Sequence, residues 1–568
     1  MQDRFQIAAL LREIGRLLTV KGDNPFKAQA YERGARALEN LNGDLDALVK
    51  AGRLTEITGI GTALASIIEE VHHTGECWIL RQLRDELPPG AIELSEIPGL
   101  SLRKIVALHD ALRIESIADL KTACEEGIVK NVKGFGQKSE AKLLKDIEKL
   151  EATEERILLH RALEQAEGIL QHLRAAPELL KADIVGSLRR RKETVRHIRV
   201  VAASEEPKAI LDHFLRLPTL VHTTALGENY CTANLAGGLG AQLNVVPPTD
   251  YIFALHTWTG SSKHITKLKE LARLKNMVFR EPLGSRSSSS CIKSEADIYR
   301  RLGIQYVPPE MREDQGEIEA AAAGTLPNPI TLEDIQGMTH CHTIYSDGQN
   351  NIDEMALAAE KMGMKYITIT DHSQSAYYAR GVGIDRLRAQ WDEIARVQER
   401  VRIKLLKGTE SDILEDGSLD YPDHILERFD IIIASIHARH KMGADQMTRR
   451  LLRALNLPFF KVWGHPLGRL LQSRPPLECR MEEVLDAIAA SKAAIEVNGD
   501  PRRLDLEPRW IRAARQRGIR FIISTDAHSI HGLGNLHYGV SMARRGWLTQ
   551  NQVLNAQDTK DFIKAVHP

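Results

Sequence analysis

The sequence has few features that would tie it to a membrane or to an oxidising compartment. No apolar run in its 568 residues is long enough to cross a membrane, and residues 1–15 read as a charged amphipathic helix rather than a signal peptide. Its six cysteines are scattered without a CxxC pair, which argues against a zinc finger and for a reducing cytosol. The sequence therefore predicts a cytoplasmic protein with no membrane partner.

Net charge is also missing. The 76 Lys and Arg residues balance the 76 Asp and Glu residues, so the formal net charge at pH 7 is zero. Any basic surface for nucleic acid must therefore be local, because the overall charge does not provide one. The composition, 43% hydrophobic and 27% charged, is that of a soluble globular protein. At about 150 residues per domain, the length suggests three or four domains.

The sequence does contain a dense set of possible metal ligands, which begins at residues 339–348. His340 and His342 alternate along an expected strand, so their side chains point the same way and can share one metal ion. Asp347, on the turn that follows, could reach the same ion. Cys341 lies between the two histidines and should face away from the metal into packing. This pair alone is weak evidence, since histidines also meet by chance.

The same pattern recurs further along the chain. Short apolar segments that we expect to be strands end at ligand-type residues, and segments with a helical period lie between them. In a parallel α/β barrel the C-terminal ends of the strands converge on one mouth. An ordinary core or loop role is plausible for any one of these residues, but it is improbable for all of them together. They are Asp371, His372, Glu410, His437, His465, Asp526 and His528.

These motifs resemble, in type and order, those of the PHP (polymerase and histidinol phosphatase) family. The motifs are HxHTxxSDG, TDHS, GTExDIL, ASIHAR, GHPLGR and STDAHS, and the resemblance covers about residues 331–568. It implies a distorted (β/α)7 barrel that holds two or three divalent ions, Mn²⁺ or Zn²⁺. Met338 and Thr339 stand where the family often has Asp-Leu, but neither position is a ligand. The implied ligands are His340, His342, Asp347, His372, Glu410, His437, His465, Asp526 and His528.

Residues 1–150 read as entirely helical, with glycine-bearing turns at 57–61, 97–101 and 132–136. They resemble helix-hairpin-helix motifs, whose turns let backbone N–H groups at a helix N-terminus approach a DNA phosphate. A single glycine between helices is usually a cap, but three such turns in this spacing favour DNA binding. Ser101 replaces the second glycine of the middle copy, which we expect to bind weakly or to serve only packing. The candidate contacts are Gly59, Gly61, Gly99, Gly134 and Gly136.

Two further regions resemble bacterial family X DNA polymerases. Residues 21–31 are similar to the segment that holds a 5′-phosphate in a DNA gap, with Lys27 and Tyr31 one helical turn apart. From residue 157 the pattern changes to α/β, and Gly186-Ser187-x-Arg189-Arg190 matches the palm of that family. Residues 259–261 and 308–313 match its thumb. The whole chain thus resembles the PolX-PHP architecture, with a helical DNA-binding domain at 1–80, a helix-hairpin-helix fingers-like domain at 81–152, palm and thumb at 153–315, a linker at 316–330 and the PHP domain at 331–568.

The palm departs from the family at its catalytic positions. Family X polymerases hold two Mg²⁺ ions with three aspartates, and the matching positions here are His197, Arg199 and Gln242. An arginine repels a cation, so we expect no Mg²⁺ in the palm and no polymerase activity. A misplaced alignment is the alternative, but the nearest acids, Asp183 and Asp212, lie outside the strand pattern.

The favoured hypothesis is a metal-dependent phosphoesterase, a 3′-5′ exonuclease or repair-end nuclease, that acts as a monomer on gapped or single-stranded DNA ends. Glu410 would bridge the metal ions, and Arg469 together with Arg502 or Arg503 would clamp the phosphate. Three alternatives remain open: a phosphatase for small phosphomonoesters, a non-catalytic DNA-binding scaffold, and residual gap-filling synthesis in base excision repair.

Overall fold

The structure is a computed structural model with two compact units. One unit spans Met1–Arg156 and Leu211–Leu243, and the other spans Ile157–Ile210 and Asn244–Pro568. The residues that the structure describes are 4–39, 41, 45–74, 77–87, 91, 94, 97, 100–112, 114, 119–120, 123–124, 126–152, 156–236, 238–277, 292–491 and 493–567.

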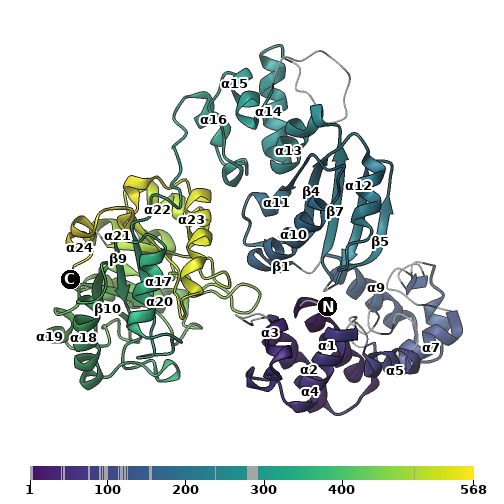
Figure 1. Ribbon diagram of the computed structural model, residues 1–568, viewed down its shortest axis with the longest axis horizontal. Coiled ribbons are helices and arrows are strands. Elements are labelled where there is room, and N and C mark those ends of the chain that lie inside the picture. The colour runs from purple at the N-terminus through teal and green to yellow at the C-terminus, as the bar shows by residue number, and fades with distance from the viewer. Residues whose placement is uncertain are drawn as a thin grey trace. The chain divides into compact units, whose positions relative to one another are not determined.

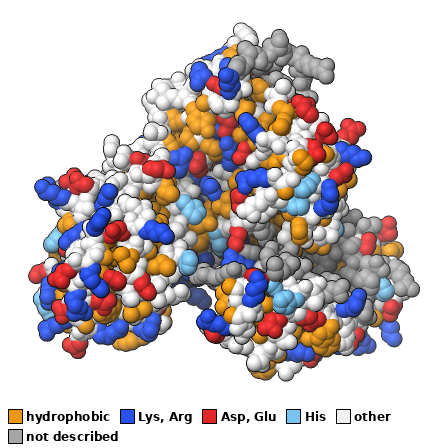
Figure 2. All heavy atoms as spheres, in the orientation of Figure 1, with side chains coloured by type: hydrophobic (Ala, Val, Ile, Leu, Met, Phe, Trp, Pro, Cys, Tyr) orange, Lys and Arg blue, Asp and Glu red, His pale blue; other side chains and the backbone are white. Residues whose placement is uncertain are grey.

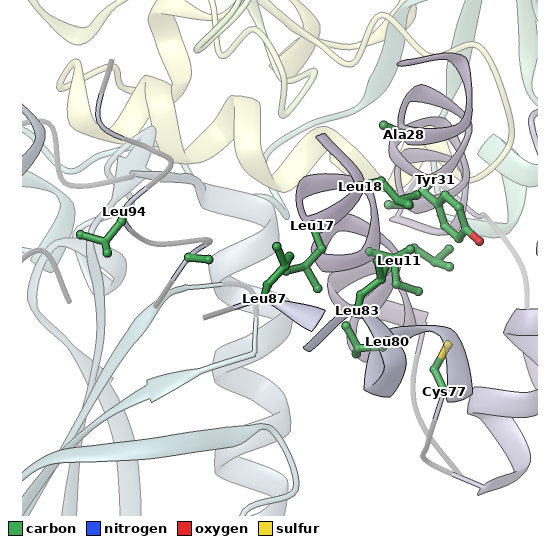
Figure 3. Packing of buried hydrophobic residues seen from close by; sticks show 14 of the residues in the cluster. Leu11, Leu17, Leu18, Ala28, Tyr31, Cys77, Leu80, Leu83, Leu87 and Leu94 are labelled. Carbon is green, nitrogen blue, oxygen red and sulfur yellow. The ribbon is translucent and has the colours of Figure 1, made fainter. Parts of the chain in front are cut away.

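The N-terminal region is helical, as predicted. On α1 (Arg4–Lys21) the buried residues Ile7, Leu11, Ile14 and Leu18 recur every three or four positions and share one face. Figure 3 shows this face packed against leucines of α5. The other elements are α2 (Pro25–Glu39), α3 (Leu45–Lys50), η1 (Leu54–Glu56), α4 (Thr62–Thr74), α5 (Trp78–Glu86), α7 (Leu102–Leu112), η2 (Val129–Asn131) and α9 (Gln137–Ala152).

The palm is built on a five-stranded sheet with the order β2-β4-β7-β6-β5. Its strands are β2 (Lys181–Val185), β4 (His197–Ala203), β5 (Leu220–Leu226), β6 (Tyr230–Leu235) and β7 (Gly240–Val246); β2 pairs antiparallel with β4, and β5 with β6. A two-residue pairing joins β1 (Ile157–Leu158) to β3 (Thr194–Val195). The helices are α10 (Leu159–Arg174), α11 (Gly186–Arg189), α12 (Pro207–Phe214) and α13 (Tyr251–Thr259), followed in the thumb by α14 (Ser262–Leu274) and α15 (Glu295–Arg301).

The C-terminal domain is a nearly closed parallel barrel whose seven strands follow one another in chain order. A bridge between Cys341 and Ala527 joins the first strand to the segment after the last. Figure 1 shows the helices of this domain around the strands, in green to yellow. The strands are β8 (Gly337–Cys341), β9 (Tyr366–Ile369), β10 (Lys404–Asp412), β11 (Ile431–Ser435), β12 (Val462–Trp463), β13 (Ala494–Asn498) and β14 (Arg520–Ser524). The helices are α17 (Ile352–Lys361), α18 (Ile384–Gln398), α19 (Asp423–Leu426), α20 (Ala444–Leu455), α21 (Met481–Ser491), α22 (Pro508–Gln516), α23 (Leu536–Arg545) and α24 (Thr559–Val566).

The first part of the expected linker is folded. Residues Glu317–Ala322 form helix α16, and Ile318 and Ala321 of this helix are buried in the apolar cluster of the thumb. Within the same unit, the Ile330 N–H donates to the Leu548 carbonyl at 2.8 Å. The prediction of a linker at 316–330 therefore needs correction, because its apolar residues pack on the thumb instead of spanning open solvent.

The described surface agrees with the balanced charge of the sequence. Figure 2 shows Lys and Arg side chains interspersed with Asp and Glu side chains on the face in view. Among the described residues, none of the helices has the length and apolarity that a membrane crossing requires.

Candidate metal centre

The barrel brings all nine predicted donors to the C-terminal ends of its strands. Five of the seven strands carry a donor at or just beyond this end, and β10 carries one, Glu410, within the strand. His340 and His342 come from the end of β8, His372 follows β9, His437 follows β11 and His465 follows β12; Asp526 and His528 follow β14, and Asp347 lies on the turn after β8.

The Glu410 carboxylate lies at the centre of this cluster and is fully buried. Its Oε1 lies 2.8 Å from His465 Nε2 and 3.1 Å from His437 Nε2. Its Oε2 lies 2.8 Å from His372 Nδ1, and 3.3 and 3.6 Å from the Nε2 atoms of His340 and His342. One carboxylate thus faces five imidazoles, an arrangement suited to bridging two metal ions.

The cluster is buried at one end and open at the other. His340, His342 and Asp526 form a buried group, in which His342 Nε2 lies 3.2 Å from Asp526 Oδ1. The side chains of Asp347 and His528 remain 34% and 33% exposed, and His528 Nε2 lies 3.3 Å from Asp347 Oδ1. A substrate from solvent would therefore meet the centre at Asp347 and His528.

Other carboxylates orient the histidines, and one of them was missed in the sequence. Glu496 on β13 is buried and lies 2.5 Å from His340 Nδ1, while its second oxygen accepts the backbone N–H of His465. Asp412 lies 2.8 Å from His437 Nδ1 in the same way. Such partners fix the ring orientation and tautomer of a metal-binding histidine. Glu496 could have been found as the one charged residue in the apolar strand Ala494–Asn498.

The turn after β8 is held by Asp371. Its carboxylate accepts hydrogen bonds from the backbone N–H and hydroxyl of Thr343, both at 2.7 Å, and from the hydroxyl of Ser346 at 2.6 Å. A Cβ added at Gly348 would lie 2.6 Å from the His342 backbone, so the SDG sequence needs glycine at this point. Asp371 and Gly348 together place Asp347 opposite His528.

Three of the donors have an unusual backbone. His340, His465 and Asp526 have φ values of 59°, 21° and 51°, a region that L residues rarely adopt. Such strain persists only where the surrounding structure imposes it, and it concentrates at functional sites. The surrounding contacts here are those of Glu496 and of the β8 to β14 closure.

The carboxylates of the cluster stay ionised. Burial disfavours the ionised form of Glu410, but the charges of His437, His372 and His340 outweigh burial and hold the pKa of Glu410 well below its usual range. Burial also raises the pKa of Asp347, but interactions led by a hydrogen bond from His528 outweigh this effect, and the pKa falls to about 2. Burial opposes protonation of His437, but Glu410 and Asp412 raise the pKa of this histidine to about 10. The site thus concentrates negative charge that only imidazolium or a metal cation can balance.

The donor set fits divalent ions. Several donor atoms are buried and have no hydrogen-bond partner among the described residues, which is costly unless a ligand satisfies them. Imidazole nitrogens with carboxylate oxygens suit Zn²⁺ and Mn²⁺. These atoms are His340 Nε2, His342 Nε2, Asp347 Oδ1, His372 Nδ1, Glu410 Oε2, His437 Nε2 and His465 Nδ1.

The expected arginine clamps lie in different environments. Arg469 is buried and bonds to the Arg503 and Leu504 carbonyls and to Glu507. Arg502 is exposed and pairs with Asp500. Arg503 is largely buried, with Nε 3.3 Å from Asp526 Oδ2, and its Nε and Nη1 have no hydrogen-bond partner among the described residues. Arg469 thus has internal partners and Arg502 lies in solvent, and of the three arginines Arg503 is the one whose guanidinium lies next to a predicted metal ligand.

The helical region repeats one hydrogen-bond pattern at all three predicted hairpins. In the first, Ile57 N–H donates to Leu54, Ile60 N–H to Ile57, and Ala65 N–H to Gly61. The pattern recurs for Ile97, Leu100 and Ile105, and for Val132, Phe135 and Glu140. Gly59 and Gly134 have φ of 99° and 94°, and a Cβ at Gly61 or Gly136 would meet no described atom within 4 Å. Gly99 lies outside the described residues.

The two residues expected to hold a 5′-phosphate differ in exposure. Lys27 is exposed, with Nζ 3.7 Å from Asp23 Oδ2. Tyr31 is 5% exposed and belongs to the helical core of Figure 3. The interpretation of Tyr31 as a DNA contact is therefore corrected to a packing role, because α2 buries the face on which its ring lies.

The palm strands present no carboxylate at the expected positions. His197 and Arg199 are exposed on β4, and Gln242 is half-buried on β7; neither His197–Ala203 nor Gly240–Val246 contains Asp or Glu. Asp183 does lie on a strand, β2, paired with Val201 on the face that carries Arg199, but it accepts a hydrogen bond from the Tyr251 hydroxyl.

The palm signature residues also have internal roles. Gly186 has φ of 70° at the start of α11, and Ser187 is half-buried beside it. Arg189 binds both carboxylate oxygens of Glu295, at 3.0 and 2.6 Å, and the Thr259 hydroxyl at 2.7 Å. Arg189 therefore joins the palm to the thumb.

Four family models match the chain. A helix-hairpin-helix domain matches residues 3–77, a SAM-like helix-hairpin-helix tandem 91–149, the DNA polymerase beta thumb 254–313, and the PHP domain 339–500.

Curated relatives match either nearly the whole chain or about a third to two fifths of it. The "DNA polymerase/3'-5' exonuclease PolX" of Bacillus subtilis (strain 168) is 34% identical over 567 residues, 98% of this chain and 99% of the relative. A "Probable phosphatase" of Thermoanaerobacter sp. (strain X514) is 28% identical over 240 residues, 40% of this chain and 93% of the relative. A "Probable phosphatase" of Caldicellulosiruptor bescii is 30% identical over 206 residues, which are 34% of this chain and 78% of the relative.

Proposed function

Because the chain belongs to the bacterial PolX family and carries its PHP domain, we propose that the barrel is a metal-dependent nuclease that shortens DNA stepwise from the 3′ end. The observation that carries the proposal is the buried Glu410 carboxylate, which faces five histidines, with Asp347 and His528 open to solvent.

The nine donors would hold two or three divalent ions, Mn²⁺ or Zn²⁺, with Glu410 between them. Ions bound there would supply a hydroxide nucleophile near neutral pH and neutralise charge on the phosphodiester. The residues around them act by position. Glu496 and Asp412 keep His340 and His437 in the ring orientation that directs Nε2 inward.

Arg503 is suited to clamp the scissile phosphate. Its buried Nε and Nη1 have no hydrogen-bond partner in the described part of the chain, although Nε lies 3.3 Å from Asp526 Oδ2, and a guanidinium fork matches two phosphate oxygens. Burial disfavours the charged form of Arg503, but the charges of Asp526 and Asp500 outweigh burial and raise the pKa of Arg503, so the side chain stays charged. Removing water from this group strengthens its attraction to charge that develops on the phosphate.

The helical region would deliver the DNA. In the first and third hairpins a Cβ added at Gly61 or Gly136, just before α4 and α9, would meet no described atom within 4 Å, so a phosphate oxygen could approach the backbone there. Backbone contacts of this kind fix position without reading sequence. We therefore expect binding to gapped or single-stranded ends that weakens steeply with salt.

The palm would hold its fold without polymerising. Arg199 and His197 on β4 and Gln242 on β7 replace a cluster of carboxylates, and an octahedral Mg²⁺ site needs oxygen ligands. Arg199 repels a cation at contact distance, whereas a carboxylate would attract it. The difference in interaction energy is on the order of several kcal/mol in a partly buried site.

The assay that tests the proposal uses the full-length protein with Mn²⁺ on DNA labelled at the 3′ or the 5′ end. Stepwise loss from the 3′ end is expected: a 3′ label is released at once as mononucleotide, and a 5′ label gives a ladder of shortening products. Internal cuts in a labelled circle, or a ladder from a 3′ label alone, would contradict the direction proposed.

A phosphatase for small phosphomonoesters is the second candidate. The observation in its favour is that relatives named as probable phosphatases match 240 and 206 residues of this chain, lengths close to that of the barrel domain. The two functions separate in one comparison, since activity on p-nitrophenyl phosphate with intact labelled DNA would move the assignment to this candidate.

A further inference from the structure

Two neighbouring tyrosines stand exposed beside the metal centre. They lie in the segment 373–382 that follows His372, where Tyr377 and Tyr378 are 87% and 69% exposed. The alanines on either side, Ala376 and Ala379, are buried. Isolated apolar side chains on a surface are ordinary, but two adjacent large rings held outward by buried neighbours suggest a binding surface.

The turn that carries the tyrosines is rigidly joined to a metal ligand. The Val382 N–H donates to the His372 carbonyl at 2.8 Å, and the Gly381 N–H donates to the Ala376 carbonyl at 3.0 Å. A Cβ added at Gly381 would lie 2.0 Å from the Ser373 carbonyl oxygen, so the turn is closed tightly at this point. The two rings therefore have a fixed place relative to His372.

The tyrosines reach from the metal centre to a neighbouring cavity. The centroid of the Tyr378 ring lies 6.0 Å from that of His372 and 6.1 Å from that of His437. Tyr377 lines a cavity of about 510 Å³ together with Arg380 and Arg386. This volume is within the range of about 300–1,000 Å³ that is usual for ligand pockets.

The charge of the cavity suits a phosphate backbone. Arg380 and Arg386 are both exposed, and two nitrogens of Arg386 bond to the carbonyls of Arg380 and Tyr345, which fixes its guanidinium. The cavity also contains Asp420, whose Oδ2 accepts the Ser375 N–H. The carboxylate is held by the turn, and two arginines against one carboxylate leave the cavity lining with a net positive formal charge.

Apolar side chains continue the surface on another side of the open end. Ile344 and Ile530 are exposed, and each is close in sequence to one of the two exposed donors, Asp347 and His528. Asn350 ties them together, because its carbonyl accepts the Ile344 N–H and its side-chain oxygen accepts the Ile530 N–H, each at 3.0 Å. Apolar groups thus border the place where the substrate enters.

We propose that Tyr377 and Tyr378 are a stacking platform for unpaired bases, so that the barrel takes single-stranded DNA ends. The inference rests on the proposed nuclease function and names its substrate class. Bases stack on aromatic side chains with little preference for sequence, and a basic groove follows the backbone. Tyr378 holds the base of the nucleotide at the metal centre, Tyr377 holds its neighbour, and Arg380 and Arg386 face the phosphates that follow. A small phosphomonoester has no second base to use this surface.

The first test measures steady-state kinetics on a 3′-labelled single-stranded oligonucleotide, with thymidine 5′-p-nitrophenyl phosphate, which carries a single base, as comparison. Tyr377→Ala is expected to raise KM for the oligonucleotide by about tenfold or more, with kcat within a few-fold and a smaller effect on the small diester. Tyr377→Phe should restore the KM, because stacking needs the ring and not the hydroxyl. Leu357→Ala, which removes an exposed apolar side chain from α17, is the matched control.

The second test changes the substrate instead of the protein. An oligonucleotide whose last three nucleotides lack bases should bind the unaltered protein about tenfold more weakly, and the Tyr377→Ala, Tyr378→Ala double variant should bind both oligonucleotides alike. Equal KM for the tyrosine variants and the unaltered protein on intact DNA would overturn the platform and leave the nuclease standing. DNA that stays intact while p-nitrophenyl phosphate is hydrolysed would overturn both.

Discussion

The barrel and the palm sheet are both built from strands with apolar core residues, but their candidate site positions carry different side chains. On β8, the residues that end the strand are His340 and Cys341, and His342 follows; on β4, the exposed positions carry His197 and Arg199. The residues that build each core are apolar in both. The side chains that form the core and those at the candidate site positions are thus separate, so the fold of a sheet does not fix the chemistry of its exposed positions.

The burial of the two sites differs as well. Most donors of the barrel are buried, three of them have a strained backbone, and they contact one another through Glu410 and Glu496. The changed positions of β4 are exposed and make few demands on the fold. Substitutions in the barrel should therefore have large effects and substitutions on β4 small ones.

The largest effect is expected from removing a direct ligand. His340→Ala or Asp526→Ala should lower nuclease activity by more than about a hundredfold, because the loss of a partner one step further out already costs about 10–100-fold. The measurement is release of 3′-labelled nucleotide in Mn²⁺, with metal content determined on the same samples. His424→Ala, which changes an exposed histidine of α19, is the control. Full activity in either ligand variant would show that the nuclease site lies elsewhere.

The next effect concerns a residue that acts through a histidine. Glu496→Gln should lower metal affinity and activity by about 10- to 100-fold, because the amide holds His340 Nδ1–H less strongly and leaves the imidazole less basic. Titration with Mn²⁺ should then restore part of the activity. Glu415→Gln removes an exposed carboxylate near β10 and should change neither quantity. A loss of activity that excess metal does not reduce would argue against this positioning role.

A smaller effect is expected at the hairpins. Gly61→Glu and Gly136→Glu place a carboxylate where the structure has open space, so the fold should tolerate them while a phosphate is repelled. DNA affinity should fall by roughly tenfold for each, the equivalent of about 1.5 kcal/mol for one charge-assisted hydrogen bond. Gly168→Glu on α10 is a matched control, since a Cβ there also meets no described atom within 4 Å. Fluorescence anisotropy at several salt concentrations gives the affinities, and equal losses in all three variants would point to net charge alone.

The fold was largely readable from the sequence, for a reason that applies to both sheets. Apolar strands with helical segments between them have a period that does not depend on the site, and all seven barrel strands were predicted from it. All donors except Glu410 lie at or beyond a strand end, and Glu410 could be found because the expected apolar strand stopped at it. Glu496 was missed because it lies inside a strand, where only the alternation of Ala494, Glu496 and Asn498 reveals that it faces the same side as the donors.

Burial was the part that the sequence did not contain. Tyr31 and Arg469 belong to residue types common at nucleic-acid sites, but the structure gives the first a place in a helical core and the second three internal partners. The partner of Arg189, Glu295, could not be foreseen either, because it lies 106 residues away in the chain. Pairings of this kind depend on tertiary contacts that no local pattern shows.

A small change in the free energy of unfolding is expected from substituting Glu193, which pairs with Arg545 of the barrel domain. Burial disfavours the ionised form of Glu193, but the charges of Arg545 and Arg469 outweigh burial and lower the pKa of Glu193 to about 2. A lowered folded-state pKa stabilises the protein above the unfolded value of about 4.3, and this stabilisation is lost as pH falls toward 2. Glu193→Gln should therefore cost about 1 to 2 kcal/mol at pH 7 and progressively less below about pH 4.5. Denaturant unfolding at pH 7, 5 and 3 measures the difference, and a difference independent of pH would contradict this account.

The smallest effect is expected in the palm, where we predict no template-dependent primer extension in Mg²⁺ or Mn²⁺. His197 and Arg199 are exposed on β4, Gln242 lies on β7, and Asp183 on β2 is engaged by Tyr251, so oxygen ligands for Mg²⁺ are too few. The assay belongs in a His340→Ala background, so that exonuclease activity cannot hide synthesis. Substituting Arg199→Ala there should change nothing measurable, because the residue supports no reaction that could be lost. The triple change His197→Asp, Arg199→Asp, Gln242→Asp replaces a cation and two neutral groups by three carboxylates, and it should allow weak extension if the palm still receives a primer end. Extension by the protein with its own palm residues would break the comparison between the two sheets, since it would show that the palm performs chemistry through ligands other than these three.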